Sequence, residues 1–352
     1  MSLRSMTFAA FAFGLVIFAA LVAVTLPPFA KGLMREVAAL DVQVKTRSLS
    51  QELARRLFAD WEELSDLASE IGTLETDIAR ARLDGFRGGE SVSWGGFADT
   101  NGIVLVASDG ILEGENLAER AWFANGLTGR FAGDVRNAVL LQKILTPNSD
   151  EPLRILDLAL PVTDTNGRVL GVLGLHINAD WLTEFLTEGA AIRGIDAILV
   201  SADGTVAASS LPLTDSDLGN PTLRAAAAGA EKEIEGRWSD GTDAMAYVLP
   251  SVTYEDLPNF GWRMVGRVDS NTYSFIQSDV TRQALLIGAA GAAIFFVMAA
   301  LFAVIVLRPI SDLTECATRI SKGETVYPPE SRTSREAVRL SRALARLSGR
   351  AG

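Results

Sequence analysis

The sequence predicts a mixed α/β (α+β) protein in which a long helix and two small α/β modules lie between two membrane-spanning helices, followed by a coiled-coil tail. Three observations predict this class. Two long stretches carry no charge, apolar residues recur at helical spacing after the first stretch, and a pattern of hairpin, helix and strands occurs twice. The chain has 352 residues and a net charge of −11, which argues against nucleic acid as a partner.

Two stretches near the chain ends contain no charged side chain over 26 and 25 residues. At about 1.5 Å per residue, each forms a helix longer than a hydrocarbon core of about 30 Å. We therefore expect a short tail at 1–6 and transmembrane helices at 7–28 and 284–307. The first stretch is longer than the core of a signal peptide, and Pro27-Pro28 follows in place of a cleavage site, which favours an uncleaved anchor.

The distribution of charge predicts the orientation in the membrane. From Arg308 onward there are nine Lys/Arg and five Asp/Glu, the N-terminal segment adds Arg4, and the stretch between the spans is strongly acidic. Short basic flanks stay in the cytoplasm, whereas long domains cross regardless of charge. We expect both termini to be cytoplasmic and 31–282 to lie outside. The lone Cys316 excludes a disulfide-stapled secreted fold, and an outer domain without cysteine suits a bacterial periplasm.

A long amphipathic helix is predicted over 31–78, leaving the membrane directly from the first span with at most one break. The apolar residues at helical spacing are Val37, Leu40, Val44, Leu49, Leu53, Leu57, Trp61, Leu64, Leu67 and Ile71. Such a stripe can pack on a neighbouring domain or on the same helix of a second subunit, and both fit a dimer.

The first α/β module is predicted at 90–187. Its elements are a hairpin within 94–112 turning at Asn101-Gly102, a short helix at 118–127, a loop around Gly133-Asp134, strands at 153–162 and 168–177 joined by Asn166-Gly167, and a helix at 179–186. Amide-glycine pairs between alternating apolar runs are typical of tight hairpins.

A weaker copy of the same order is predicted at 195–270. Its elements are a hairpin at 197–210, a helix at 221–229, and strands at 232–238, 244–249 and 262–268. Both hairpins carry a Gly-x-Val turn, at Gly102 and at Gly204. The repeated order indicates two related modules arranged along the long helix.

Several motifs of the first module resemble those of the double Cache family of bacterial extracytoplasmic sensor domains. They are "WGGFADTNG" (94–102), "RAWF" (120–123), "GDV" (133–135), and Pro161-Val162 followed by "GRVLGVLG" (167–174). The resemblance covers 31–282. It implies a membrane-distal and a membrane-proximal PAS-like module, with a small molecule bound in the distal one, in a protein of the bacterial inner (plasma) membrane.

The tail at 308–350 resembles a HAMP domain. Arg308-Pro309 stands at the membrane exit, Gly323-Glu324 ends a first helix, and a loop with Pro328-Pro329 precedes a second. Apolar residues at steps of three and four form two seams, at Ile310, Leu313, Ala317 and Ile320 and at Ala337, Leu340, Leu344 and Leu347. The resemblance implies a parallel four-helix bundle from two chains. The open alternative is an amphipathic tail on the inner leaflet.

Arg120, Trp122 and Phe123 are candidates for ligand binding. A guanidinium can hold a carboxylate through two hydrogen bonds, and aromatic side chains exclude water from that ion pair. In the amino-acid-binding branch of the double Cache family, the residues matching Arg120 and Trp122 hold the ligand's carboxylate. That branch has Tyr where Phe123 stands, and an Asp for the ligand's ammonium where His176 stands, so the departures argue against an α-amino acid.

Asp157 is the other candidate, because it interrupts an apolar strand. Alternation places it on the face of Ile155 and Ala159, where a carboxylate must be paired or face a wet pocket. Its partner could be a cationic ligand group, His176 or Arg120.

The same residues have structural interpretations that the sequence leaves open. Arg120 can form an ion pair with Glu119, Asp134 or Asp157, and Asp157 can cap a turn or join a structural pair. Trp122 can be ordinary core, and His176 can be a strand residue with its hydrogen bonds satisfied.

We expect no enzyme. The chain has one His, no cluster of metal-ligating residues, no phosphate-binding loop and no nucleophile elbow, so we expect neither a metal nor a cofactor.

The favoured hypothesis is a homodimeric membrane receptor that senses a small periplasmic solute, with a carboxylate-bearing solute as the favoured candidate. It relays the signal through the second transmembrane helix to a HAMP bundle and onward to a separate cytoplasmic signalling protein. Two alternatives remain. The chain can be a ligand-independent accessory or scaffold subunit paired with a kinase or chemoreceptor, or a truncated part of a longer signalling enzyme, because no output domain follows the tail.

Overall fold

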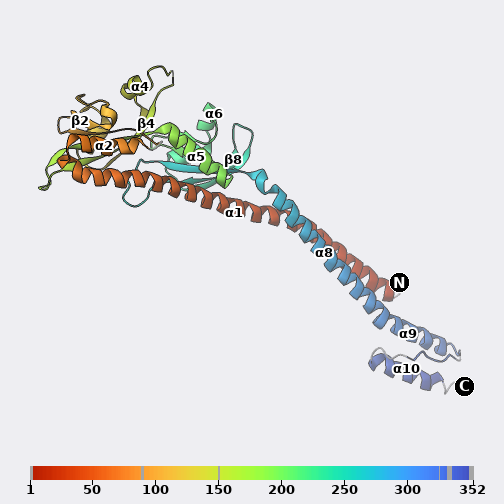
Figure 1. The fold of residues 1–352 in the computed structure, drawn as a ribbon. Coiled ribbons are helices and arrows are strands. Elements are labelled where there is room, and N and C mark those ends of the chain that lie inside the picture. Colours follow the sequence, from red (N-terminus) through yellow and green to blue (C-terminus); the bar gives the residue numbers. More distant parts are fainter. Residues whose placement is uncertain (1–2, 89–90, 150, 325, 331–334, 349–352) are drawn as a thin grey trace. The chain divides into compact units, whose positions relative to one another are not determined.

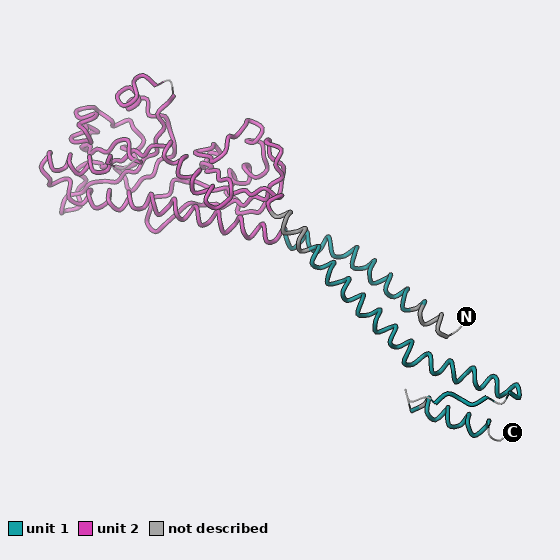
Figure 2. The backbone as a smooth tube through the Cα atoms, turned by 45° about the vertical axis from the view of Figure 1, so that its right-hand side comes forward, with its two compact units in different colours: residues 1–34, 274–352 teal, residues 35–273 magenta. Residues whose placement is uncertain are grey.

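The computed structural model describes residues 3–88, 91–149, 151–324, 326–330 and 335–348 (Figure 1). It confirms the predicted fold class, with a long N-terminal helix, two five-stranded antiparallel sheets and two apolar helices. The chain divides into two compact units, residues 35–273 and residues 1–34 with 274–352, which Figure 2 colours separately.

Helix α1 (Leu3–Glu70) begins earlier and ends sooner than the helix expected at 31–78. It stops at a 3-10 turn, η1 (Ile71–Thr73), which is followed by α2 (Thr76–Arg87). Gly72 stands in this turn, and a Cβ there would lie 2.8 Å from Leu170 Cδ1, so the glycine permits the close approach of Leu170.

The distal module consists of five strands and two short helices. They are β1 (Val92–Asp99), β2 (Val104–Ala107), α3 (Ala121–Gly126), β3 (Phe131–Asn137), α4 (Val139–Leu145), β4 (Arg154–Thr163) and β5 (Val169–Asn178). The sheet order is β2-β1-β5-β4-β3. The prediction of a loop around Gly133-Asp134 is wrong, because those residues lie in strand β3. This strand pairs with β4 in an irregular register.

Helix α5 (Ala179–Arg193) leads into the proximal module. Its elements are β6 (Asp196–Val200), β7 (Val206–Ser209), α6 (Asp215–Leu218), α7 (Pro221–Ala227), β8 (Lys232–Arg237), β9 (Asp243–Leu249) and β10 (Arg263–Asp269). The sheet order β7-β6-β10-β9-β8 repeats that of the distal sheet strand for strand, so the predicted internal repeat is confirmed.

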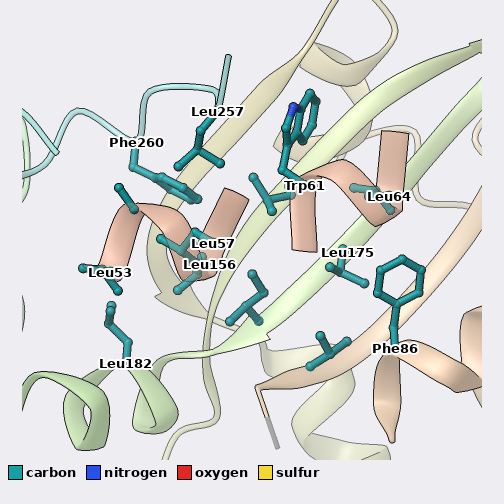
Figure 3. Packing of buried hydrophobic residues seen from close by; sticks show 14 of the residues in the cluster. Leu53, Leu57, Trp61, Leu64, Phe86, Leu156, Leu175, Leu182, Leu257 and Phe260 are labelled. Atoms are coloured by element: carbon teal, nitrogen blue, oxygen red, sulfur yellow. The ribbon is translucent and has the colours of Figure 1, made fainter. Parts of the chain in front are cut away.

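Both sheets bury one face against α1 and the other against short helices. Figure 3 shows Leu53 and Leu57 of α1 beside Leu156 of β4 and Leu182 of α5. On the opposite face of the distal sheet lies a separate core that includes Trp94 and residues of α3 and α4. The candidate site residues lie on this second face.

The other unit contains the helices of the expected membrane spans and the C-terminal tail. They are the N-terminal part of α1, α8 (Ser274–Phe302), a π-helical turn η4 (Ala303–Leu307), α9 (Arg308–Ser321) and α10 (Arg335–Ser348). Two of the described helices are long and apolar enough to cross a membrane. Phe11 of α1 contacts Phe295 of α8 edge to face, and Leu313 of α9 is buried with Ala337 and Leu344 of α10.

Candidate functional site

The register of the distal sheet brings three polar or aromatic side chains together on the face away from α1. Trp94 in β1 is opposite His176 in β5, and His176 is opposite Asp157 in β4. Because side chains alternate along a strand, opposed residues point to the same face. The strand prediction thus placed Asp157 and His176 correctly with respect to the sheet.

Asp157 is the centre of a buried polar cluster and is 1% exposed. Arg136 of β3 donates two hydrogen bonds to its carboxylate, from Nε to Oδ2 at 2.7 Å and from Nη2 to Oδ1 at 2.9 Å. Burial alone would raise the pKa of Asp157, but His176 and Arg136 outweigh it and hold that pKa below its ordinary value. The carboxylate is therefore ionised and already paired.

His176 Nδ1 lies 2.7 Å from Asp157 Oδ1. The contact is electrostatic, because Nδ1 has no hydrogen-bond partner among the described residues. It helps to hold the pKa of Asp157 below its ordinary value.

Two tryptophans fix the His176 ring. The ring stacks on Trp94 with centroids 4.8 Å apart and meets Trp122 edge to face at 5.7 Å. A Cβ at Gly174 would lie 2.6 Å from the Trp122 ring, so this glycine is what lets Trp122 approach the sheet. The result is a rigid polar group set in an aromatic wall.

A small cavity of about 30 Å³ opens beside this cluster. Its polar lining consists of Arg120, Arg136 and His176, with Trp122 as the aromatic wall. The cavity admits on the order of one or two water molecules. Its apolar lining includes three consecutive residues of α4, Val139, Leu140 and Leu141.

The predicted site residues are placed differently with respect to this cavity. Arg120, Trp122 and His176 line it. Asp157 lies behind it and positions Arg136 and His176. Phe123 is buried in the core on the same face of the sheet and is not among the lining residues.

Arg120 forms none of the ion pairs that the sequence left open. It stands at the N-cap of α3, and no partner for its guanidinium is found in the described part of the chain. Arg136 and helix α4, by contrast, are part of the site and were missed. The only sequence signal for Arg136 was that a cation stands three residues after Gly133. The position of Arg136 in the sheet depends on the irregular register of β3, which the sequence does not show.

The arrangement is suited to binding an anion. One unpaired guanidinium, a second guanidinium and an imidazole border the cavity, while the one nearby carboxylate is neutralised by two partners. An ammonium group would find no free carboxylate in this lining. Among the residues described, no group of three or more His, Cys, Asp or Glu side chains could hold a metal ion.

No family model and no curated protein matches the chain. Several solved structures do. The ligand-binding domain of the Pseudomonas fluorescens chemoreceptor CtaA with L-isoleucine has 14% identity and a TM-score of 0.49, covering 72% of this chain and 99% of that one. The domain of the Campylobacter jejuni chemoreceptor Tlp3 with L-norvaline has 11% identity and a TM-score of 0.49, covering 69% and 93%.

An extracellular ligand binding receptor from Desulfohalobium retbaense has 15% identity and a TM-score of 0.46, and the match covers 64% of this chain and 39% of that one. At these identities and scores the likeness carries no argument about the ligand. The three structures described are one extracellular ligand binding receptor and the ligand-binding domains of two chemoreceptors.

Proposed function

We propose that the chain is a membrane-bound receptor whose distal module binds a small solute through a carboxylate. The observation that carries the proposal is the unpaired Arg120 at a cavity that Arg136 and His176 also line. A guanidinium at such a boundary gains a charge-assisted pair when a carboxylate enters. Trp122 supplies an aromatic wall beside that pair.

The cavity must enlarge to admit such a ligand, because about 30 Å³ is too small for it. Helix α4 is the element that moves in this proposal. It contributes three apolar residues to the lining, and two of its side chains, Val139 and Ile144, are largely exposed. Although Leu141 of this helix is buried, its exposed positions leave α4 less tightly held than the strands of the sheet.

Ligand binding in the distal module is proposed to bias the position of α8 and, through it, the tail. Strand β10 of the proximal sheet leads through Ser270–Tyr273 into α8. The same strand packs closely on α1, since a Cβ at Gly266 would lie 1.9 Å from Thr46 Oγ1. A coupling of about 1–3 kcal/mol between ligand and tail is ordinary for such relays.

The proposal includes a homodimer with the outer domain, 31–282, in the periplasm. Apolar residues are exposed at steps of three and four on α1, at Val37, Leu40 and Val44. The tail leaves Leu340 and Leu347 of its second seam exposed, while its other members pack on α9. A second copy of the chain would cover both stripes. Its α9 and α10, together with those of the first copy, would complete a four-helix HAMP bundle.

The experiment uses the full chain in lipid nanodiscs and follows Trp fluorescence, because Trp94 and Trp122 border the site. The probes are small mono- and dicarboxylates and their neutral amides. We expect saturable responses to a carboxylate and not to its amide, with affinity falling about ten- to a hundredfold in Arg120→Ala.

The matched control is Arg168→Ala, since Arg168 lies on a hairpin with a largely exposed side chain. Equal affinity of the wild-type chain and Arg120→Ala for every carboxylate that binds would refute the site. A carboxylate and its amide binding equally would refute the ligand class.

A further inference from the structure

A second cavity, separate from the distal site and widely open to solvent, lies between the two modules. Its volume is about 310 Å³, against about 30 Å³ for the distal cavity. Its lining residues come from the start of β4 and from α5 on one side, and from β7 and the segment through α6 on the other. Small-molecule sites typically begin near this volume and often lie between modules.

Arg154 is the only cation in the lining, and its guanidinium has no ion-pair partner within the described ranges. The other arginines of the distal module, apart from Arg120, each form an ion pair: Arg130 with Asp256, Arg136 with Asp157, Arg168 with Asp164 and Arg193 with Glu52. The two unpaired arginines of this module thus each border a cavity.

The remainder of the lining is mostly apolar. Val206, Leu213 and Leu218 are among its residues, and Leu218 is 52% exposed although it is a large hydrophobic side chain. The hydroxyls of Thr183 and Ser209 already donate to backbone carbonyls. Arg154 is therefore the strongest unengaged donor toward the cavity.

Asp215 is the one carboxylate of the lining, and its side chain is exposed to water. It disfavours a ligand with several negative charges and favours one whose single charge lies at the Arg154 end. An apolar chain of a few carbons can then cover Leu213 and Leu218.

We propose that this inter-module cavity binds a small aliphatic monocarboxylate, with its carboxylate on Arg154 and its chain against the apolar wall. A carboxylate gains a pair of hydrogen bonds from the guanidinium, and the chain removes exposed apolar surface from water. A ligand here touches the distal module through β4 and α5 and the proximal module through β7. Binding therefore stabilises one arrangement of the two modules, whatever occupies the distal cavity.

The test is calorimetric titration of the full chain in nanodiscs with acetate, butyrate and hexanoate, corrected with empty nanodiscs. We expect affinity to rise about three- to fourfold per methylene until the cavity is full. Hexanol, which has the chain without the charge, should bind far more weakly. In Arg154→Gln we expect hexanoate affinity to fall about ten- to a hundredfold, and in Thr183→Phe, which fills the cavity, binding should be lost.

Two matched variants separate this site from the distal one. Arg168→Gln removes an equivalent charge from an exposed hairpin and should leave hexanoate affinity unchanged, as should Arg120→Ala. Unchanged affinity in Arg154→Gln, or no saturable binding of any chain length to the wild-type chain, would overturn the proposal. Loss of hexanoate binding in Arg120→Ala alone would assign the carboxylate to the distal cavity and also overturn it.

Discussion

Asp157 shows how a buried charge can be structural and still shape a binding site. Its carboxylate is fully used by Arg136 and His176, so it cannot receive a cationic ligand group. Arg136 and His176, which Asp157 holds in place, also line the cavity. In the proposed site Asp157 is a positioning residue, and the ligand would contact Arg120, Arg136 and His176.

Replacing Asp157 by Asn should destabilise the outer domain by about 3–5 kcal/mol at neutral pH, because a buried pair loses its negative partner. The pKa of Asp157 is lowered in the folded chain, so its contribution is complete above its ordinary pKa of about 4. That contribution is lost as pH falls through the lowered folded-state pKa. Urea unfolding followed by Trp fluorescence at neutral and acidic pH measures the difference.

The control for this prediction is Asp256→Asn, which breaks the exposed ion pair with Arg130. We expect a change well below that of Asp157→Asn. A difference between Asp157→Asn and the wild-type chain that stays constant down to pH 2–3 would contradict the pairing described.

At the scale of elements, local turn chemistry was enough to predict most strands. Asn101-Gly102 and Asn166-Gly167 each turn a hairpin whose strands were predicted within a few residues. Strand β3 was missed because it contains Gly133, and because its register with β4 shifts between Gly133 and Arg136. Its strand conformation comes from pairing with β4, which no local pattern encodes.

The residues of the candidate site were predicted in part for the same reason. Alternation along a regular strand placed Asp157 on the face of Ile155 and Ala159, with His176 among its possible partners. Trp122 was a candidate from its spacing with Arg120 and from the family resemblance. Arg136 follows the register shift of β3, and α4 is a short helix without an N-cap side chain, so neither carries a local signal. The contact of Arg136 with Asp157 forms only when β3 pairs with β4, so it cannot be predicted from the sequence around either residue.

The packing of α1 on β10 gives a prediction at this scale. Gly266→Ala adds a Cβ that would lie 1.9 Å from Thr46 Oγ1, so the helix and strand must separate. We expect a loss of about 1–3 kcal/mol in the free energy of unfolding, typical of overpacking. Thermal or urea unfolding of the full chain in nanodiscs measures it.

The double variant Thr46→Ala with Gly266→Ala removes the clashing hydroxyl and should recover part of that loss, with a coupling of about 0.5–3 kcal/mol. Gly236→Ala in β8 is the control, since a Cβ there meets no atom within 4 Å. Additive effects of the two substitutions would show that α1 and β10 are not in the contact described.

At the scale of the whole molecule, the repeated sheet order gives the two modules one topology and different chemistry. The distal sheet buries Asp157 and His176 on the face away from α1. At that face of the proximal sheet, Arg267 is buried between Asp196 and Asp240, with its guanidinium 4.7 Å from the Trp238 ring. Arg267 is thus paired within its own module, whereas Arg120 at the distal cavity has no ion-pair partner among the described residues.

The proposed homodimer gives the prediction at this scale. Cys316 is 5% exposed and is a poor crosslinking site, so the experiment uses Leu340→Cys in a Cys316→Ser background. Leu340 lies on the predicted seam and is exposed in the single chain, so a parallel bundle brings two copies of it together. We expect rapid oxidative crosslinking to a dimer in native membranes, and much slower crosslinking of Arg342→Cys, which lies off the seam. If Leu340→Cys crosslinks only to a different receptor or kinase, the homodimer is refuted and the accessory-subunit alternative is supported. The exposed seam would then pack against another chain in preference to a second copy of this one.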